Sequence, residues 1–536
     1  MPLPSSSWSP RIRVSDTLQN NLRAAAEYDA TLRLAQFREL RARGALCTEV
    51  TEQLATEAAT AFLDRFESLG EYLGDAITLL AEISTLEEPC LAEPGQRATF
   101  PLLVERLSDS FAPQYCLLYD RAFSQMITVC RRLPSATKLD AALRRFGLNS
   151  ERDLLERKAR LRKRPPMLDA RERQRVKKVL VLSRVTLGAD VAITSVVWQK
   201  ARQSFPQAEL VLLGSPKLLQ LFGGDGSLRI HKIQYQAAGG LLDRLASWLP
   251  VAEAVEEETK TLRPEEFVVI DPDSRLLQLG LLPALQDESR YFFLESRCFG
   301  EPGQGSMSQI TLRWLNSMFG GPDASNDDIL PAVSLRSEDK EFGRELCRKL
   351  RQGGSSFLVA ASFGVGGNRQ KRLPDPFEEE LLLRLLEEGS TVLLDKGAGE
   401  EELDRASRLV ERVKASGRTV IEADRESASR LSGPEPICCQ MLTWQGEIGA
   451  FSALVGESDE YIGYDSAGQH IAAALGVPTI DIFTEAASVV FQERWRPCGR
   501  GIVKVAGVAF SGGKPPNAET VIAEVVDSHR ANHRGS

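Results

Sequence analysis

The stretch that most constrains the fold is YIGYDSAGQHIAAALGVPTIDIFT, at positions 461–484. It reads as a buried strand, a polar turn, a short helix rich in alanine, and a second buried strand. Asp465 and Ser466 are residue types that begin helices, and Gly476 followed by Pro478 ends one. The stretch therefore predicts a β-α-β unit whose polar turn lies at the carboxyl end of a parallel strand, where open α/β sheets bind their ligands.

The polar turn of this unit has two interpretations. The start of its helix offers free backbone N–H groups and a partial positive charge, which suit an anion. His470, beside the carboxylate of Asp465, can orient such an anion or donate to it. Ser466 and Gln469, however, have the spacing of a capping box, which by itself indicates only a well-made helix start. The residues of the turn alone do not decide between the two.

Length and charge narrow the class of protein. A chain of 536 residues is too long for one hydrophobic core and suggests about three domains. The net charge of -8 argues against a nucleic-acid binder with a generally basic surface. No stretch approaches the roughly 20 apolar residues of a membrane span, and the N-terminal MPLPSSSWSPRIR lacks the apolar core of a signal peptide. We therefore expect a cytoplasmic protein.

The cysteines and histidines agree with that location. The 9 cysteines are scattered and contain no CxxC pair, so reduced thiols are expected. Two of the 4 histidines, His529 and His533, stand in the tail, which argues against a histidine-based metal site. The sequence thus predicts neither a metal nor another cofactor.

The first 150 or so residues are expected to be all-helical, because apolar side chains recur at helical spacing in residues 15–43, 51–84 and 101–133. This part would pack on the rest of the chain or mediate a homo-oligomer. A basic stretch at 157–178 follows, interrupted by Pro165 and Pro166, which mark a domain boundary. Its lysines and arginines either hold the protein against anionic lipid or an acidic acceptor, or form a solvated helix face.

Beyond this boundary, short apolar strands alternate with helices, which predicts parallel, doubly wound α/β sheets. The expected strands are 177–183, 208–213, 228–233, 267–270 and 291–294, and the pattern restarts with strands at 356–362 and 391–395 before the 461–484 unit. Two Rossmann-like domains in succession would enclose a ligand-binding cleft. Neither has a well-placed GxGxxG or a Walker A sequence, which disfavours a nicotinamide dehydrogenase and a P-loop kinase.

The predicted organisation has four parts. Residues 1–165 form the helical domain with its basic linker, 166–345 the first Rossmann-like domain, and 346–515 the second. Residues 516–536 form a C-terminal helix followed by a disordered tail, HRANHRGS.

Three segments resemble, in order, the signature regions of glycosyltransferase family 9, the ADP-heptose:lipopolysaccharide heptosyltransferase-like enzymes. They are TLGADVAITSVVWQKARQSFPQAELVLLG, SFGVGGNRQKRLPD and YDSAGQHIAAALGVPTIDIF. The resemblance covers residues 177–515 and leaves out the helical N-terminus. It implies a GT-B fold, in which the first Rossmann-like domain holds an acceptor and the second a nucleotide-activated sugar.

The resemblance also implies metal-independent, inverting chemistry. A carboxylate after the first strand removes a proton from the acceptor hydroxyl, which attacks the sugar as the nucleoside diphosphate leaves. Asp190 is the matching carboxylate, and Thr186, Leu187 and Gly188 form the acceptor-side turn before it. Family members usually place the acid directly after Leu-Gly, whereas Ala189 intervenes here. Either the turn is one residue longer and Asp190 still serves, or Asp190 merely caps the following helix.

In the second domain, the resemblance assigns the donor site. Lys371 and Arg372 match a Lys-Arg pair that would neutralise the departing diphosphate, although Leu373 stands where the family has tryptophan. Asp465 would contact sugar hydroxyls, and the helix start after it would hold the diphosphate. The donor-binding residues expected are Ser362, Gly364, Lys371, Arg372, Asp465, Ser466, Ala467, Gly468, Gln469 and His470.

The sequence therefore predicts a glycosyltransferase that moves a sugar, by family resemblance heptose from ADP-heptose, to a hydroxyl of a cell-envelope glycan such as lipopolysaccharide core. Its partners would be the nucleotide sugar and a glycan or glycolipid acceptor, with no nucleic acid. Two alternatives stay open: a non-catalytic nucleotide-sugar-binding or scaffold protein, and a sugar-nucleotide epimerase of the same fold.

Overall fold

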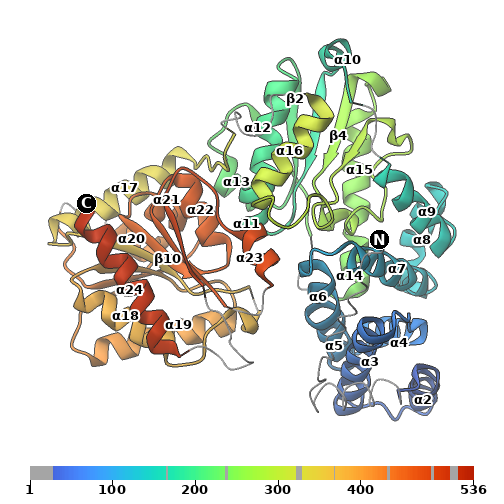
Figure 1. The fold of residues 1–536 in the computed structure, drawn as a ribbon, viewed down its shortest axis with the longest axis horizontal. Helices are drawn as coiled ribbons and strands as arrows, with labels where there is room; N and C mark the ends of the chain where they lie inside the picture. Colours follow the sequence, from blue (N-terminus) through green and yellow to red (C-terminus); the bar gives the residue numbers. More distant parts are fainter. Residues whose placement is uncertain are drawn as a thin grey trace, which may run out of the picture. The chain divides into compact units, whose positions relative to one another are not determined.

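The computed structural model describes residues 28–163, 167–235, 239–320, 329–366, 368–430, 435–484, 488–507 and 517–535. The boundary expected at Pro165 and Pro166 lies outside these residues. The chain divides into two compact units, whose residue ranges can be followed by colour along the ribbon in Figure 1. One unit gathers the chain up to Ser108 with Leu117–Asp153 and Ala238–Ala246, and the other gathers Asp109–Cys116, Leu154–Ala237 and Ser247–Ser536.

The first unit is all-helical, as predicted. The range 51–84, expected to be helical, divides at Gly70, which ends α3 in the left-handed conformation with φ of 68°. An unexpected member is α14 (Leu241–Ala246), in which the Arg244 guanidinium lies 3.6 Å from the centre of the Phe100 ring. The other helices that lie in this unit or reach into it are α2 (Ala30–Ala42), α3 (Thr48–Leu69), α4 (Gly74–Ser84), α5 (Pro89–Arg97), α6 (Glu105–Asp109), α7 (Pro113–Cys130), α8 (Thr137–Arg145) and α9 (Glu151–Arg162).

The second unit contains two parallel sheets. The first has the order β3-β2-β1-β4-β5, with every neighbouring pair parallel. Its strands are β1 (Lys178–Leu182), β2 (Glu209–Gly214), β3 (Leu228–Lys232), β4 (Phe267–Asp271) and β5 (Tyr291–Phe293), which confirms all five expected strands to within two residues at each end. Its helices are α10 (Ala170–Arg175), α11 (Leu187–Ala189), α12 (Ser195–Ser204), α13 (Leu218–Phe222), α15 (Trp248–Thr259) and α16 (Met307–Phe319).

The second sheet has the order β12-β11-β10-β6-β7-β9-β8 and is also parallel throughout. It contains the predicted strands β6 (Leu358–Ser362), β7 (Thr391–Asp395), β10 (Glu460–Tyr464) and β11 (Thr479–Phe483), together with three that the sequence did not reveal, β8 (Val420–Asp424), β9 (Met441–Gln445) and β12 (Val503–Gly507). Its helices are α17 (Ser337–Gln352), α18 (Phe377–Glu387), α19 (Glu400–Ala415), α20 (Arg425–Arg430), α21 (Ile448–Gly456), α22 (Ala467–Leu475), α23 (Val489–Trp495) and α24 (Ala518–Gly535). The predicted α/β class, with two Rossmann-like sheets as in GT-B enzymes, is therefore confirmed.

The expected disordered tail is wrong. Helix α24 continues to Gly535, and His529 within it is fully buried. Its ring nitrogens lie 2.5 Å from Oε2 of Glu460 and 3.0 Å from Oγ of Ser390. These contacts at the amino ends of β10 and β7 hold a polar segment that composition alone marks as tail.

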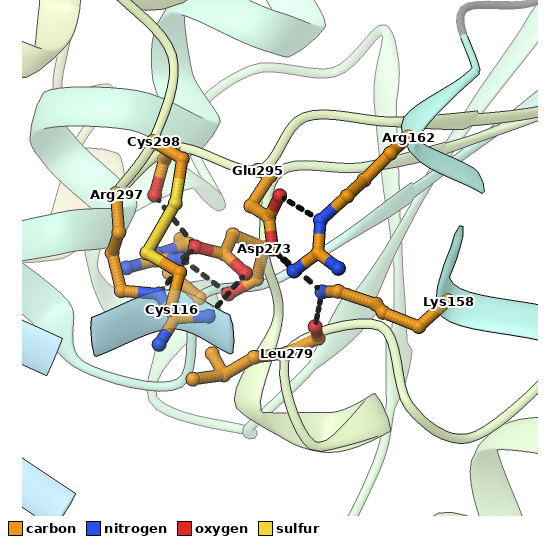
Figure 2. The surroundings of a disulfide bond; sticks show 10 residues. Cys116, Lys158, Arg162, Asp273, Leu279, Glu295, Arg297 and Cys298 are labelled. Atoms are coloured by element: carbon orange, nitrogen blue, oxygen red, sulfur yellow. Dashed lines mark hydrogen bonds and ion pairs between the residues drawn. A yellow bond between two sulfur atoms is a disulfide. The ribbon is translucent and has the colours of Figure 1, made fainter. Parts of the chain in front are cut away.

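The basic stretch is used inside the fold more than the solvated-face interpretation allows. Arg157 and Lys158 are buried, and Arg157 donates to Glu288 and to the carbonyl of Gly280. Lys158 pairs with Glu295 at 3.2 Å, and Arg162 binds the same carboxylate through two hydrogen bonds of 2.8 Å, as Figure 2 shows. Part of the positive charge expected at a membrane surface is therefore neutralised internally. Among the described helices, none is long and apolar enough to cross a membrane.

The expectation of reduced thiols is also wrong for one pair. Cys116, in α7, and Cys298, after β5, form a disulfide across 182 residues of sequence (Figure 2). The bond lies beside Arg297, whose Nε donates to Asp273 at 3.0 Å. Sequence spacing carries no information about such a pair, because only the fold brings the two cysteines together.

Candidate functional site

Predicted donor-site residues meet at the carboxyl ends of β6 and β10, which are neighbouring strands of the second sheet. Asp465 directly follows β10, and Lys371 ends a 3₁₀ turn, Arg369–Lys371, in the segment after β6. Nζ of Lys371 lies 2.7 Å from Oδ2 of Asp465, and Nε2 of Gln469 donates to Oδ1 of the same carboxylate at 2.7 Å. The structure therefore joins three of the ten predicted donor-binding residues in one hydrogen-bonded group.

The capping box, one of the two interpretations of the start of α22, does not form. Ser466 occupies the N-cap position in extended conformation, but its side chain makes no capping hydrogen bond. The Oε1 of Gln469 does not accept from the N-cap N–H as a capping box requires; its Nε2 instead donates to the buried carboxylate of Asp465 in a charge-assisted hydrogen bond. The first-turn N–H groups of α22 are thus left without the side-chain cap that would compete with an anion.

Two glycines in this unit make room for one tyrosine. A Cβ on Gly468 would lie 2.0 Å from Oη of Tyr461, and a Cβ on Gly463 would lie 2.6 Å from the same atom. The ring of Tyr461 therefore runs over Gly463 and ends beneath the first turn of α22. Gly468 is required here by close packing, which is a more specific role than the donor contact predicted from the family resemblance.

His470 is buried and uncharged at neutral pH. Burial lowers the pKa of its imidazole to about 4, with Lys371 acting in the same direction and Asp465 against it. The ring packs edge-on against Trp495, with 6.0 Å between ring centroids. An anion near this turn would therefore meet a neutral imidazole.

Three predicted residues have other partners. Oγ of Ser362 donates to Asp395 at 3.2 Å, which keeps it at the same sheet edge. Glu402 binds the turn after Gly364, because its Oε1 accepts hydrogen bonds from the backbone N–H groups of Val365 and Gly366. Arg372 lies outside the Lys371 group, because it binds Glu378 at 2.9 Å and Asp375 at 3.0 Å.

Asp190 is buried at the carboxyl end of β1. Its Oδ1 accepts from the Arg184 N–H and the Thr194 hydroxyl, each at 2.7 Å, and its Oδ2 accepts from the Ser183 hydroxyl at 2.8 Å. Burial raises the pKa of Asp190 to about 6, although these hydrogen bonds lower it. The carboxylate therefore has a proton affinity suited to a base at neutral pH and, at the same time, braces the strand to the helix.

The extra residue, Ala189, is absorbed by a π-helical turn. The backbone runs from α11 through a π-turn over Asp190–Thr194 into α12. Such turns accommodate a single additional residue within a helix and occur often at functional sites. The acceptor-side turn before it has Thr186 exposed, while Gly188 packs on α22, where a Cβ would lie 3.1 Å from Cδ2 of His470.

A charged cluster at the carboxyl ends of β4 and β5 was not predicted. Asp273 is fully buried between Arg184 and Arg297 and also accepts from the Ser296 hydroxyl at 2.9 Å. Burial raises the pKa of Asp273, but the two guanidinium groups outweigh it and hold the pKa well below its usual range. The pattern SRV after β1 contained Arg184, but its partner lies about ninety residues later in the chain.

Asp481 is a second residue that the sequence analysis passed over. It stands in β11, in the apolar run TIDIF, and is fully buried. Within the described residues, neither of its carboxylate oxygens has a hydrogen-bond partner. A lone acid in a buried strand was a signal that could have been read from the sequence. Among those same residues, no three His, Cys, Asp or Glu side chains gather in a way that could hold a metal ion.

Several solved structures of glycosyltransferases are similar to this chain. The glycosyl transferase family 9 from Veillonella parvula DSM 2008 is 15% identical, with a TM-score of 0.48 over 69% of this chain and 99% of that one. E. coli ADP-heptose lps heptosyltransferase II is 14% identical, with a TM-score of 0.44 over 66% and 98%. E. coli heptosyltransferase WaaC with ADP is 13% identical, with a TM-score of 0.42 over 66% and 100%. No protein-family model and no curated protein matches the sequence.

Proposed function

We propose that this chain is an inverting glycosyltransferase that moves a sugar from a nucleoside diphosphate to a hydroxyl group. The observation that carries the proposal is the group formed by Lys371, Asp465 and Gln469 at the start of α22. It combines an ammonium group, a carboxylate and uncapped helix N–H groups at a sheet edge where α/β domains bind ligands.

Each part of this group has a role in transfer. The ammonium of Lys371 neutralises the charge that grows on the leaving diphosphate, and the helix start holds the phosphate oxygens. Asp465 accepts hydrogen bonds from the sugar hydroxyls once Lys371 turns to the phosphate. Because the imidazole of His470 is neutral, it does not neutralise the charge of the diphosphate, and Lys371 has this role.

Asp190 is the proposed general base. Its pKa of about 6 keeps it ionised at neutral pH and able to take a proton from an acceptor hydroxyl. Since Oδ2 accepts from the Ser183 hydroxyl, rotation of that hydroxyl would free the oxygen for the acceptor. The exposed Thr186 would then line the acceptor-side turn.

The proposed donor is ADP-heptose. Its heptose would be transferred, without a metal ion, to a cell-envelope glycan or glycolipid. One similar solved structure is E. coli WaaC with ADP-2-deoxy-2-fluoro heptose, whereas an Anabaena protein, HepE, was solved with UDP and glucose. Contact of the exposed part of the 157–178 stretch with the inner membrane surface, and oligomer formation through the helical unit, belong to the same proposal.

The test begins by measuring the binding of ADP, UDP, GDP and CMP from the shift that each causes in thermal unfolding. A nucleotide at about a hundred times its Kd adds roughly 2.7 kcal/mol to the stability of the chain. Release of nucleoside diphosphate from ADP-heptose is then measured with and without acceptor extract, in EDTA, for the wild type, Asp190→Asn and Asp465→Asn. Equal rates in all three folded proteins would refute the proposal, as would binding of no nucleotide.

A non-catalytic nucleotide-sugar-binding protein is the second candidate, and one observation favours it. Every oxygen of Asp190 already accepts a hydrogen bond from the protein, and the side chain is buried. This candidate predicts nucleotide binding that depends on Lys371, no turnover with any acceptor extract, and no change in binding for Asp190→Asn.

A further inference from the structure

A buried polar layer lies beneath the proposed donor site, between the second sheet and α22. In the pairing of β10 with β11, Asp481 stands opposite Gly463, so its side chain is on the sheet face over which the Tyr461 ring runs. Helix α22 covers this face, and Gln469 in its first turn is fully buried. Within the described residues, both oxygens of Asp481 and Oε1 of Gln469 are buried without a hydrogen-bond partner.

The charged groups around Asp481 are few. Asp465, at the end of β10, raises the pKa of Asp481, whereas Lys371 and Arg496 lower it. Tyr461 faces it from β10, and His470 contributes a neutral ring from α22. Lys371 is already paired with Asp465 at 2.7 Å. An ionised Asp481 would therefore add a second carboxylate beside the one that Lys371 already pairs, in a place where a diphosphate has to bind.

A proton on Asp481 resolves this conflict. Burial of an unpaired carboxylate is costly, and the group then binds a proton instead. Burial and then the charge of Asp465 raise the pKa of Asp481 well above its usual value. A neutral Asp481 carries an O–H donor that no described group accepts, and the nearby Asp465, whose charge acts on it, loses a partner when Lys371 moves.

We propose that Asp481 is a positioning residue of the donor site, a neutral carboxylic acid that donates to Asp465 when Lys371 leaves it for the diphosphate. The donation is direct or passes through one buried water. Asp465 thereby keeps its orientation toward the sugar, and no ionised carboxylate is left without a donor. The inference rests on the proposed function, since it requires a diphosphate to attract Lys371.

The experiment compares Asp481→Asn with Asp481→Val by calorimetric titration with ADP and UDP. Asparagine can donate a hydrogen bond and valine cannot, so we expect Asp481→Asn to bind within about 3-fold of the wild type and Asp481→Val about 10-fold more weakly. Asp271 supplies the matched control, because it is fully buried at the end of β4 in the first sheet and burial raises its pKa to about 6. Asp271→Asn and Asp271→Val should bind the nucleotide equally. Equal affinities of the two Asp481 variants would overturn the proposal.

A spectroscopic measurement keeps the proposal testable if Asp481→Val does not fold. The infrared spectrum of the wild type at pH 7 should contain a carboxylic-acid C=O band that is absent from Asp481→Asn, and ADP should shift this band. A missing band, or one that ADP leaves unchanged, would overturn the role of Asp481. Failure of every variant and of the wild type to bind a nucleotide would instead refute the donor site itself, while the band still reports whether Asp481 is neutral.

Discussion

Nζ of Lys371 lies 2.7 Å from Oδ2 of Asp465, and the two side chains differ in exposure: 27% of the lysine side chain is accessible, against 8% of the aspartate. A partly accessible ammonium can exchange a carboxylate for a phosphate, whereas the buried carboxylate stays in place. The pair is therefore arranged for a change of partner by the lysine alone.

Replacing Lys371 by methionine should weaken binding of the nucleoside diphosphate about 10- to 100-fold, because a charge-assisted hydrogen bond contributes about 1.5–3 kcal/mol. Calorimetric titration of Lys371→Met against the wild type measures this. Arg369→Gln is the matched control, since Arg369 lies in the same turn with its side chain 77% exposed and paired with Glu401. An equal loss in both variants would indicate a general effect of charge and contradict the assignment.

Asp190→Ala should be much less stable than Asp190→Asn. Alanine leaves the buried Arg184 N–H and the hydroxyls of Ser183 and Thr194 without their acceptor, which we expect to cost about 2–4 kcal/mol. Asparagine keeps one acceptor oxygen, and the two hydroxyls can rotate, so its cost should be about 1 kcal/mol. Urea unfolding at pH 7 measures both values, and equal stabilities would show that Asp190 does not brace the turn. Asp190→Asn is therefore the variant for any test of catalysis.

The pKa of Asp190 also predicts a pH dependence of stability. Burial raises this pKa from 3.8 to about 6, so the folded state binds the proton more tightly than the unfolded state. The resulting stabilisation is complete below about pH 4 and is lost as pH rises through 6, a change of about 3 kcal/mol. The free energy of unfolding of the wild type relative to Asp190→Asn, measured from pH 4 to pH 8, should fall over this window. A constant difference would contradict the raised pKa.

The sequence predicted the β-α-β elements well because their signals are local. Strand β7 has the predicted bounds, since Thr391 to Asp395 is a short apolar run between two polar helices. Strand β8, by contrast, lies at the edge of the sheet, where Ala423 is its one buried residue, and VIEAD carries too little apolar character to stand out. Two of the three missed strands, β8 and β12, are the edge strands of this sheet, whereas β9 lies inside it between β7 and β8.

The candidate site was predicted by residue type better than by partner. Lys371, Asp465 and Gln469 came from motifs and do meet, but the capping-box interpretation of Gln469 was wrong because its amide donates to Asp465, four residues earlier, instead. Asp190 was found, whereas its burial depends on a π-turn that no sequence period indicates. The disulfide and the ion pairs of the basic stretch join segments far apart in sequence, which local patterns do not relate.

Breaking the Cys116–Cys298 bond should lower the free energy of unfolding by about 2–4 kcal/mol, because the bond restricts the unfolded chain over a long loop. Urea unfolding of Cys116→Ser and Cys298→Ser, alone and together, measures this loss, and the double variant should lose no more than either single one. Cys438→Ser, at an exposed free cysteine, is the control. Mass mapping of the pair in cells tests the cytoplasmic prediction as well, since disulfides rarely persist in a reducing compartment.

The contact of His529 with Glu460 should make the end of α24 necessary for stability. Both side chains are fully buried, and the imidazole supplies one of the donors to a carboxylate that also accepts from Asn532. His529→Leu leaves that carboxylate with an unmet acceptor, which we expect to cost about 3–5 kcal/mol.

His533 is the matched control for this change, because it lies one turn later in α24 and is exposed. His533→Gln removes an edge-on ring contact with Phe357 and should alter stability by about 1 kcal/mol or less. In the double variant His529→Leu/Glu460→Gln the cost should be smaller than the sum of the two single costs, since the buried charge is removed together with its partner. Strict additivity would show that the two side chains do not stabilise each other, and loss of residues 529–536 without effect would restore the disordered tail that the composition of HRANHRGS predicts.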